Sequence, residues 1–178
     1  MSSELERLDS RAGRLARLGF GDAVRADLLA QRIGVGAGLL AEIGKVADPD
    51  LALASLAHLV EAAGAATALD DRHDALALHA ALQTDVDFRR RLFAVLGASL
   101  ALGDHLATHP ADWAELADPE VDAVRPTGLG MRSTLAAAVE GLTGAAAHEA
   151  LRSTYRRLLL RLAARDLVGV VGFDDVAA

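Results

Sequence analysis

Two histidines, His105 and His109, lie four residues apart, and Asp104 directly precedes the first of them. On a helix this spacing places both imidazoles on one face, where they could bind a metal ion. No glutamate stands between the histidines, no third ligand is evident, and Pro110 places His109 at a helix C-terminus. The helix dipole stabilises a protonated histidine there. We therefore favour a structural role for the pair over a metal-dependent enzyme, and we expect no metal-binding residues in this chain.

The glycine-rich segment 34–38 (GVGAG) is a second candidate, for phosphate binding. A phosphate loop follows a strand and leads into a helix whose N-terminus receives the phosphate. No strand pattern precedes this segment and no Lys-Ser or Lys-Thr follows it, so we interpret it as a hinge between helices. Serines lack a nucleophile elbow, and helix capping explains acidic pairs such as Asp70-Asp71 and Asp174-Asp175. The sequence thus predicts no catalytic and no cofactor-binding residues.

A row of arginines near the C-terminus is the most distinctive charged feature of this otherwise acidic chain. Like charges four residues apart destabilise an isolated helix, so these side chains need partners elsewhere. One interpretation, which we favour, is pairing with acids on neighbouring helices. The other is docking to an acidic surface or to nucleotide phosphates. The candidate domain-contact residues are Arg152, Arg156, Arg157, Arg161, Arg165 and Asp166.

Composition indicates that packed helices position these residues. Hydrophobic residues make up 52% of the 178 residues, much of that fraction is alanine, and aromatic residues make up only 3%. Alanine is the strongest helix former, and strand formers are scarce. A net charge of -7 argues against nucleic acid as a partner. The chain has no cysteine, no signal-peptide pattern and no sufficiently apolar membrane span, which favours a cytoplasmic location.

Helix start and stop signals predict an all-α, irregular bundle of about eight or nine short helices with one long, arginine-rich C-terminal helix. Ser3, Asp22 and Asp48-Pro49 are expected to begin helices, and the long helix is expected to run from Thr143 to about Val168. Phe173-Asp174-Asp175 looks like the start of a further helix, which suggests the front part of a longer polypeptide. We divide the chain into a helical subdomain (1–117), a linker (118–130) and a long-helix segment (131–178).

Four stretches resemble the N-terminal region of the bifunctional glutamine synthetase adenylyltransferase/adenylyl-removing enzymes, in their actinobacterial form. They occur in the family's order and cover the chain from end to end. The stretches are RLGF at 17–20; ADPDLAL at 47–53; RRRLFAVLGAS at 89–99, continuing with LGDHL at 102–106 and HPADW at 109–113; and ALR at 150–152 with YRR at 155–157 and AARDL at 163–167.

The resemblance implies an enzyme that regulates nitrogen assimilation through two nucleotidyltransferase domains. One domain transfers AMP from ATP to a tyrosine of glutamine synthetase, and the other removes it by phosphorolysis. Carboxylates of an Asp-Xaa-Asp motif hold Mg²⁺, which neutralises charge on the phosphoryl group in transfer. Magnesium and ATP are thus implied as cofactors of the full-length family. The implied partners are glutamine synthetase and a downstream nucleotidyltransferase domain of the same polypeptide.

The sequence departs from the family at the catalytic motif, which in the family follows the Arg-Asp-Leu helix by several turns. The chain ends at Ala178, before that motif, and both Asp48-Pro49-Asp50 and Asp85-Val86-Asp87 are interpreted as helix starts. We therefore expect a non-catalytic segment, inactive alone, with its arginine helix against the nucleotidyltransferase domain. The alternative is a free-standing helical adaptor that binds an acidic protein partner through the same helix.

Overall fold

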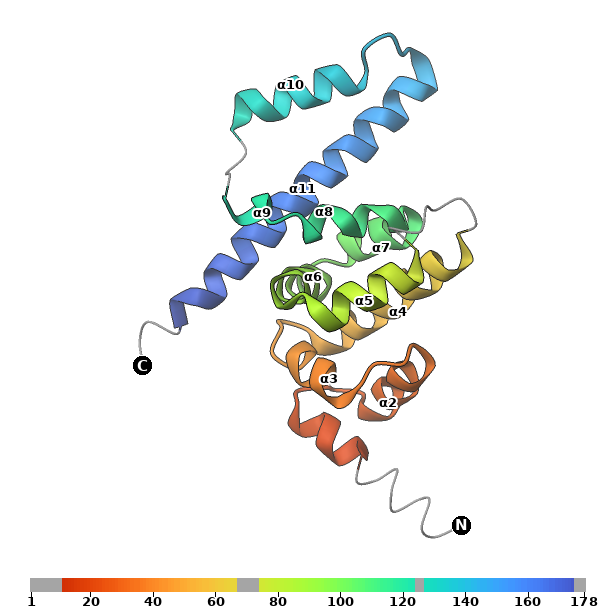
Figure 1. Cartoon of the computed structure of the whole chain (residues 1–178), viewed down its shortest axis with the longest axis vertical. Helices are drawn as coiled ribbons and strands as arrows, with labels where there is room; N and C mark the ends of the chain where they lie inside the picture. Colours follow the sequence, from red (N-terminus) through yellow and green to blue (C-terminus); the bar gives the residue numbers. More distant parts are fainter. Residues whose placement is uncertain (1–10, 67–73, 124–126, 175–178) are drawn as a thin grey trace.

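A computed structural model describes residues 11–66, 74–123 and 127–174. These residues form an all-α, irregular bundle, as predicted, and contain no strand (Figure 1). Residues 11–17 are helical. The elements that follow are α2 (Ala23–Arg32), α3 (Ala37–Ile43), α4 (Pro49–Ala65), α5 (Ala75–Thr84), α6 (Val86–Ala98), α7 (Leu100–Thr108), the 3-10 turn η1 (Pro110–Trp113), α8 (Ala114–Ala117), α9 (Glu120–Ala123), α10 (Gly128–Ala138) and α11 (Gly144–Asp174).

Short acidic and hydroxyl side chains begin most of these helices. Asp48 Oδ1 accepts from the backbone N–H of Leu51 at 2.9 Å, and Pro49 occupies the first turn, where its missing N–H is not needed. Asp85 caps α6 in the same way, and Asp22 caps α2. These contacts confirm the predicted starts at Asp22 and Asp48-Pro49. The predicted start at Ser3 and the Asp70-Asp71 pair lie outside the described residues.

The core of the bundle lies where α4 packs against α6 and α7. Leucines of α4 and α6 are fully buried there, and Phe88 of α6 packs against Trp113 with ring centroids 5.3 Å apart. Arg91 of α6 is also buried, and its Nε donates to the carbonyl of Leu116 at 2.8 Å. Because that bond satisfies the α8 backbone from inside the core, it fixes the short turns η1 and α8 against α6.

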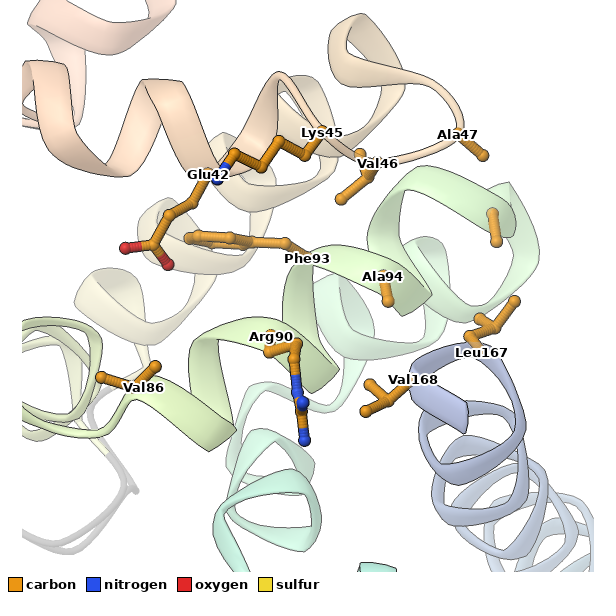
Figure 2. A pocket seen from close by; sticks show the side chains of 11 residues that line it. Glu42, Lys45, Val46, Ala47, Val86, Arg90, Phe93, Ala94, Leu167 and Val168 are labelled. Carbon is orange, nitrogen blue, oxygen red and sulfur yellow. The ribbon is translucent and has the colours of Figure 1, made fainter. Parts of the chain in front are cut away.

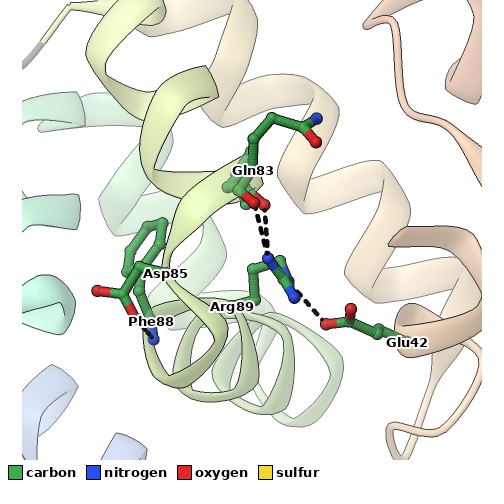
Figure 3. A network of polar contacts seen from close by, with 6 residues as sticks. Glu42, Gln83, Asp85, Phe88 and Arg89 are labelled. Atoms are coloured by element: carbon green, nitrogen blue, oxygen red, sulfur yellow. Dashed lines mark hydrogen bonds and ion pairs between the residues drawn. The ribbon is translucent and has the colours of Figure 1, made fainter. Parts of the chain in front are cut away.

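On another side of α6, the side chain of Arg89 contacts both α3 and α5 (Figure 3). Its Nε donates to Glu42 Oε2 of α3 at 2.8 Å, and its Nη1 donates to the carbonyl of Leu82, in the last turn of α5, at 3.1 Å. The Arg89 side chain is only 11% exposed, so this ion pair is screened less than a surface pair. The contact therefore fixes α3 and the end of α5 relative to α6.

Helix α11 runs diagonally past the bundle; its N-terminal part lies beside α10, and its C-terminal end projects to one side (Figure 1). The sequence predicted that it would stop near Val168 and that a new helix would begin at Phe173; that prediction was wrong, because α11 continues to Asp174. Gly169 and Gly172 lie inside the helix instead of ending it. A glycine in a helix interior costs only about 1 kcal/mol relative to alanine, which does not by itself break the backbone hydrogen-bond ladder.

The segment proposed as a linker, 118–130, contains helix α9 and the first residues of α10. Beyond it, α10 packs mainly on α11 and lies apart from the helices α2–α5 (Figure 1). No residue of α10 is buried. Among the described residues, no helix is long and apolar enough to cross a membrane.

Candidate contact surface on helix α11

Among the described residues, helix α11 joins the bundle mainly through one face. Thr154, Leu160, Ala164 and Val168 are buried, and the helix contacts α6, α8 and α9 through this region. The spacing of these residues places them on one side of a helix with 3.6 residues per turn. The arginines predicted as contact residues lie on several sides of the helix, and the structure divides them into paired and unpaired groups.

Arg161 pairs with acids of the same chain. Its Nη1 lies 3.0 Å from Glu115 Oε2 of α8 and 2.9 Å from Asp118 Oδ2, just beyond α8. Burial lowers the pKa of Arg161, but the hydrogen bonds and charges of Glu115 and Asp118 outweigh burial and raise the pKa overall. Arg161 thus holds α11 to α8, as the favoured interpretation of the arginine row predicted.

Among the acids that contact Arg161, Asp118 has a pKa that the fold lowers. The backbone N–H of Glu120 donates to Asp118 Oδ1 at 2.9 Å and lowers the pKa of Asp118; burial opposes this effect, and Arg161 lowers the pKa further. Because the carboxylate is the form that makes both contacts, the folded state binds a proton less readily than the unfolded state. Asp118 is therefore a local source of acid sensitivity.

We expect the stabilisation from Asp118 to be fully present above its ordinary pKa of 3.8 and to be lost as the pH falls through its lower pKa in the folded state. The test is urea unfolding of the native protein and of Asp118→Asn at a series of pH values. Asparagine retains an oxygen for the N–H of Glu120 but does not titrate. The difference in unfolding free energy should shrink as the solution is acidified; a difference independent of pH would contradict this assignment.

The other candidate residues on α11 have weaker contacts or none. Arg152 pairs with Glu149 at 2.7 Å, but both side chains are more than half exposed. Arg156 and Arg157 make no ion pair or hydrogen bond with a described residue. Arg165 Nη1 is buried without a hydrogen-bond partner, and Asp166 is exposed. Three arginines of this helix therefore remain available to groups outside the described residues.

Arg152 and Arg156 also border a polar cavity between α7 and α11, with a volume of about 310 Å³. The two histidines lie on its other side, with stacked rings whose centroids are 4.7 Å apart. Nε2 of His105, a side chain only 5% exposed, lies 2.9 Å from Asp112 Oδ2. No three histidine, aspartate or glutamate side chains of the described residues form a group that could hold a metal ion. The geometry accordingly gives His105 a structural partner, Asp112, and gives this pair no further ligand.

Replacement of Asp112 by alanine is expected to lower the unfolding free energy by about 2 kcal/mol, because it leaves the buried imidazole of His105 without its partner. Asp112→Asn, which keeps an oxygen at this position, should lose less. Urea unfolding followed by circular dichroism measures both. Equal losses for the two variants would show that the hydrogen bond to His105 is not the cause.

An apolar groove of about 550 Å³ lies beside the C-terminal part of α11. Leu167 and Val168 of α11 form one wall, Phe93 and Ala94 of α6 form another, and Val46 closes it from the segment before α4 (Figure 2). Lys45 and Arg90 bring positive charge to its edge. The volume lies within the range of binding pockets, so the groove can accept several apolar side chains.

Sequence reasoning missed Asp112, Glu115 and Asp118, which bind His105 and Arg161, and it missed the groove. The acids lie within or beside the HPADW stretch, yet their partners are up to 46 residues away. Residue spacing along one helix carries no information about such distant pairs. The one signal available in the sequence was the presence of three acids, Asp112, Glu115 and Asp118, at the boundary between the predicted helical subdomain and the predicted linker.

Comparison with curated proteins shows similarity to bifunctional glutamine synthetase adenylyltransferase/adenylyl-removing enzymes. The chain is 40% identical over 177 residues to the bifunctional glutamine synthetase adenylyltransferase/adenylyl-removing enzyme of Streptomyces avermitilis, and 38% identical to that of Streptomyces coelicolor. Each match covers 97% of this chain. The same enzyme of Corynebacterium diphtheriae is 34% identical, over 76% of the chain. No model of a known protein family matches the chain, and no solved structure matches it significantly. The chain spans about 16% of the length of these curated relatives.

Proposed function

We propose that this chain is a helical, non-catalytic segment of a cytoplasmic bifunctional glutamine synthetase adenylyltransferase/adenylyl-removing enzyme. The observation that carries the proposal is the similarity to the Streptomyces enzymes over 97% of this chain, which nevertheless spans only 16% of their length. On this proposal the AMP transfer and removal named for the relatives belong to other parts of the polypeptide.

The chemistry of the side chains supports a non-catalytic role. Nucleotidyl transfer requires carboxylates that hold magnesium against the phosphates of ATP. Among the described residues, no three histidine, aspartate or glutamate side chains form a group that could hold a metal ion. Asp48 and Asp85, which belong to the two Asp-Xaa-Asp sequences in the described residues, accept hydrogen bonds from the N-termini of α4 and α6. We therefore assign magnesium and ATP to the remainder of the enzyme and derive no catalytic step on this chain.

The proposed role is to support an adjoining nucleotidyltransferase domain. Arg156, Arg157 and Arg165 have no partner among the described residues and can pair with acids of that domain. The groove beside Leu167 and Val168 can receive apolar side chains next to these charges. Contact with glutamine synthetase would then occur through the assembled enzyme.

The first test is to sequence the genomic DNA that follows the codon for Ala178 and search it for a frame encoding a glycine-containing Asp-Xaa-Asp segment. The encoded region is then co-expressed with the tagged chain as a separate polypeptide, and we expect the two to copurify. Arg156→Glu together with Arg157→Glu should reduce recovery, whereas Arg132→Glu, at an exposed position of α10, should not. Transfer of labelled AMP to glutamine synthetase by the chain alone would overturn the proposal.

A further inference from the structure

The face of α11 that points away from the bundle carries an apolar stripe. Leu151, Tyr155, Leu158 and Leu162 follow one another at intervals of four, three and four residues. Leu151 is 41% exposed and Tyr155 is 50% exposed. The buried residues Leu160 and Ala164 lie on the opposite side of the helix. Leu158 and Leu162 are half-buried. We call Leu151, Tyr155, Leu158 and Leu162 the α11 seam.

We propose that the α11 seam binds the α11 seam of a second copy of this chain, with the two helices antiparallel. Alternating intervals of three and four residues form the apolar stripe of a coiled coil, in which side chains of one helix insert between those of its neighbour. Large apolar side chains that stay this exposed on an otherwise packed helix indicate a surface that another molecule covers. This proposal does not depend on the assignment of the chain to an enzyme family.

The seam is complementary to itself. When two copies of α11 lie antiparallel, Leu151 of one copy can pack on Leu162 of the other, and Tyr155 can pack on Leu158. The same two contacts repeat on the other side of the two-fold axis, so all four residues are used and none is left over. A contact that closes in this way is the isologous interface of a symmetric dimer and leaves no free edge for further association.

Charges beside the seam match the same arrangement. Arg152 and Asp166 lie along one side of the stripe, and in an antiparallel pair Arg152 of one copy lies about 7 Å along the axis from Asp166 of the other. Helical side chains lean towards the N-terminus of their own helix, so these two lean towards each other and close most of that gap. Asp166 has no partner among the described residues, and Arg152 has only its exposed pair with Glu149. The complementary charges therefore favour a second copy in the antiparallel orientation.

The first experiment measures the mass of the purified 178-residue chain by sedimentation equilibrium over a wide range of concentration. We expect a dimer that dissociates on dilution. Tyr155→Asp should shift dissociation to concentrations at least about tenfold higher, because it places a charge in the seam. Leu76→Asp alters a leucine of α5 that is 80% exposed, more than any seam residue, and should leave the mass unchanged. A monomer at every concentration, or a dimer that is equally sensitive to both variants, would overturn the proposal.

A charge exchange tests the orientation. Arg152→Asp and Asp166→Arg, each alone, should weaken the dimer about tenfold, because each places like charges beside the seam. The double variant exchanges the charges within both symmetric contacts and should restore the native dissociation constant. Both substituted positions are exposed, so circular dichroism should show unchanged helix content. Failure of the double variant to recover, with the fold intact, would exclude this register.

Cross-linking gives an independent result, since the chain contains no cysteine. A Tyr155→Cys protein mixed with a Leu158→Cys protein should form a disulfide-linked mixed dimer on oxidation. Each variant oxidised alone should form much less. Preferential linking of Tyr155→Cys to itself would indicate parallel helices and would contradict the proposal.

Discussion

Replacing Gly44 by alanine is expected to lower the unfolding free energy by about 3 kcal/mol. A Cβ at this position would overlap the backbone oxygen of Leu18 and lie 3.1 Å from the Leu18 Cβ. The backbone of Gly44 is helical, with φ of -62°, so the cost comes from the collision and not from the dihedral angle. Leu18 cannot retreat easily, because it precedes Gly19, whose φ of +98° fixes the turn that leads to Phe20.

The matched control is Gly38→Ala, six residues earlier in α3, where nothing lies within 4 Å of the added methyl group. Alanine is a better helix former than glycine, so this variant should gain up to about 1 kcal/mol. Urea unfolding followed by circular dichroism measures the two changes. Similar losses in both variants would show that backbone contact at Leu18 is not responsible.

Arg161→Glu is expected to lower the unfolding free energy by about 2 kcal/mol and to loosen the contact between α11 and α8. The substitution replaces two ion pairs, of 3.0 and 2.9 Å, with repulsion between the new carboxylate and those of Glu115 and Asp118. The estimate stays below that for a fully buried pair, because the Arg161 side chain is 28% exposed. Urea unfolding gives the loss of stability, and cleavage by trypsin under native conditions reports whether α11 has become accessible.

Arg152→Glu is the control for this effect, since Arg152 lies on the same helix and its ion pair with Glu149 is exposed. At concentrations where the chain is monomeric, it should change the unfolding free energy by no more than about 0.5 kcal/mol. Combining Arg161→Glu with Glu115→Arg should recover part of the loss, because it restores one opposite-charge contact. A loss of equal size for Arg152→Glu, or no recovery in the combined variant, would argue against a specific α8–α11 ion pair.

The helical fold could be predicted because its signals are local. The carboxylate of Asp48 and the ring of Pro49 act within one turn of the helix they begin, so their sequence positions locate the start of α4. The same holds for Asp22 and α2. Alanine content and the scarcity of strand formers were enough to indicate an all-α bundle.

The contacts of the arginine helix could not be predicted, because they depend on how distant helices pack. Arg161 and Arg157 have the same side chain and lie four residues apart, yet only Arg161 meets carboxylates of another helix. Gly169 shows a second limit of prediction from sequence. A glycine ends a helix only where the chain forms more favourable contacts by turning than by continuing the helix. The helix continued through Gly169, and the groove beside Leu167 and Val168 formed from segments that are far apart in sequence.

Helix α10 gives the molecule an uneven resistance to local opening. None of its residues is buried, and most of its packing is on α11, so separating α10 from α11 exposes little additional apolar surface. Its amides should therefore exchange with deuterium through openings that leave α4 and α6 intact, and much faster than amides in those helices. If another protein is added and exchange in α10 becomes slower, that protein contacts α10. This result would be informative even where the melting temperature of the bundle does not change.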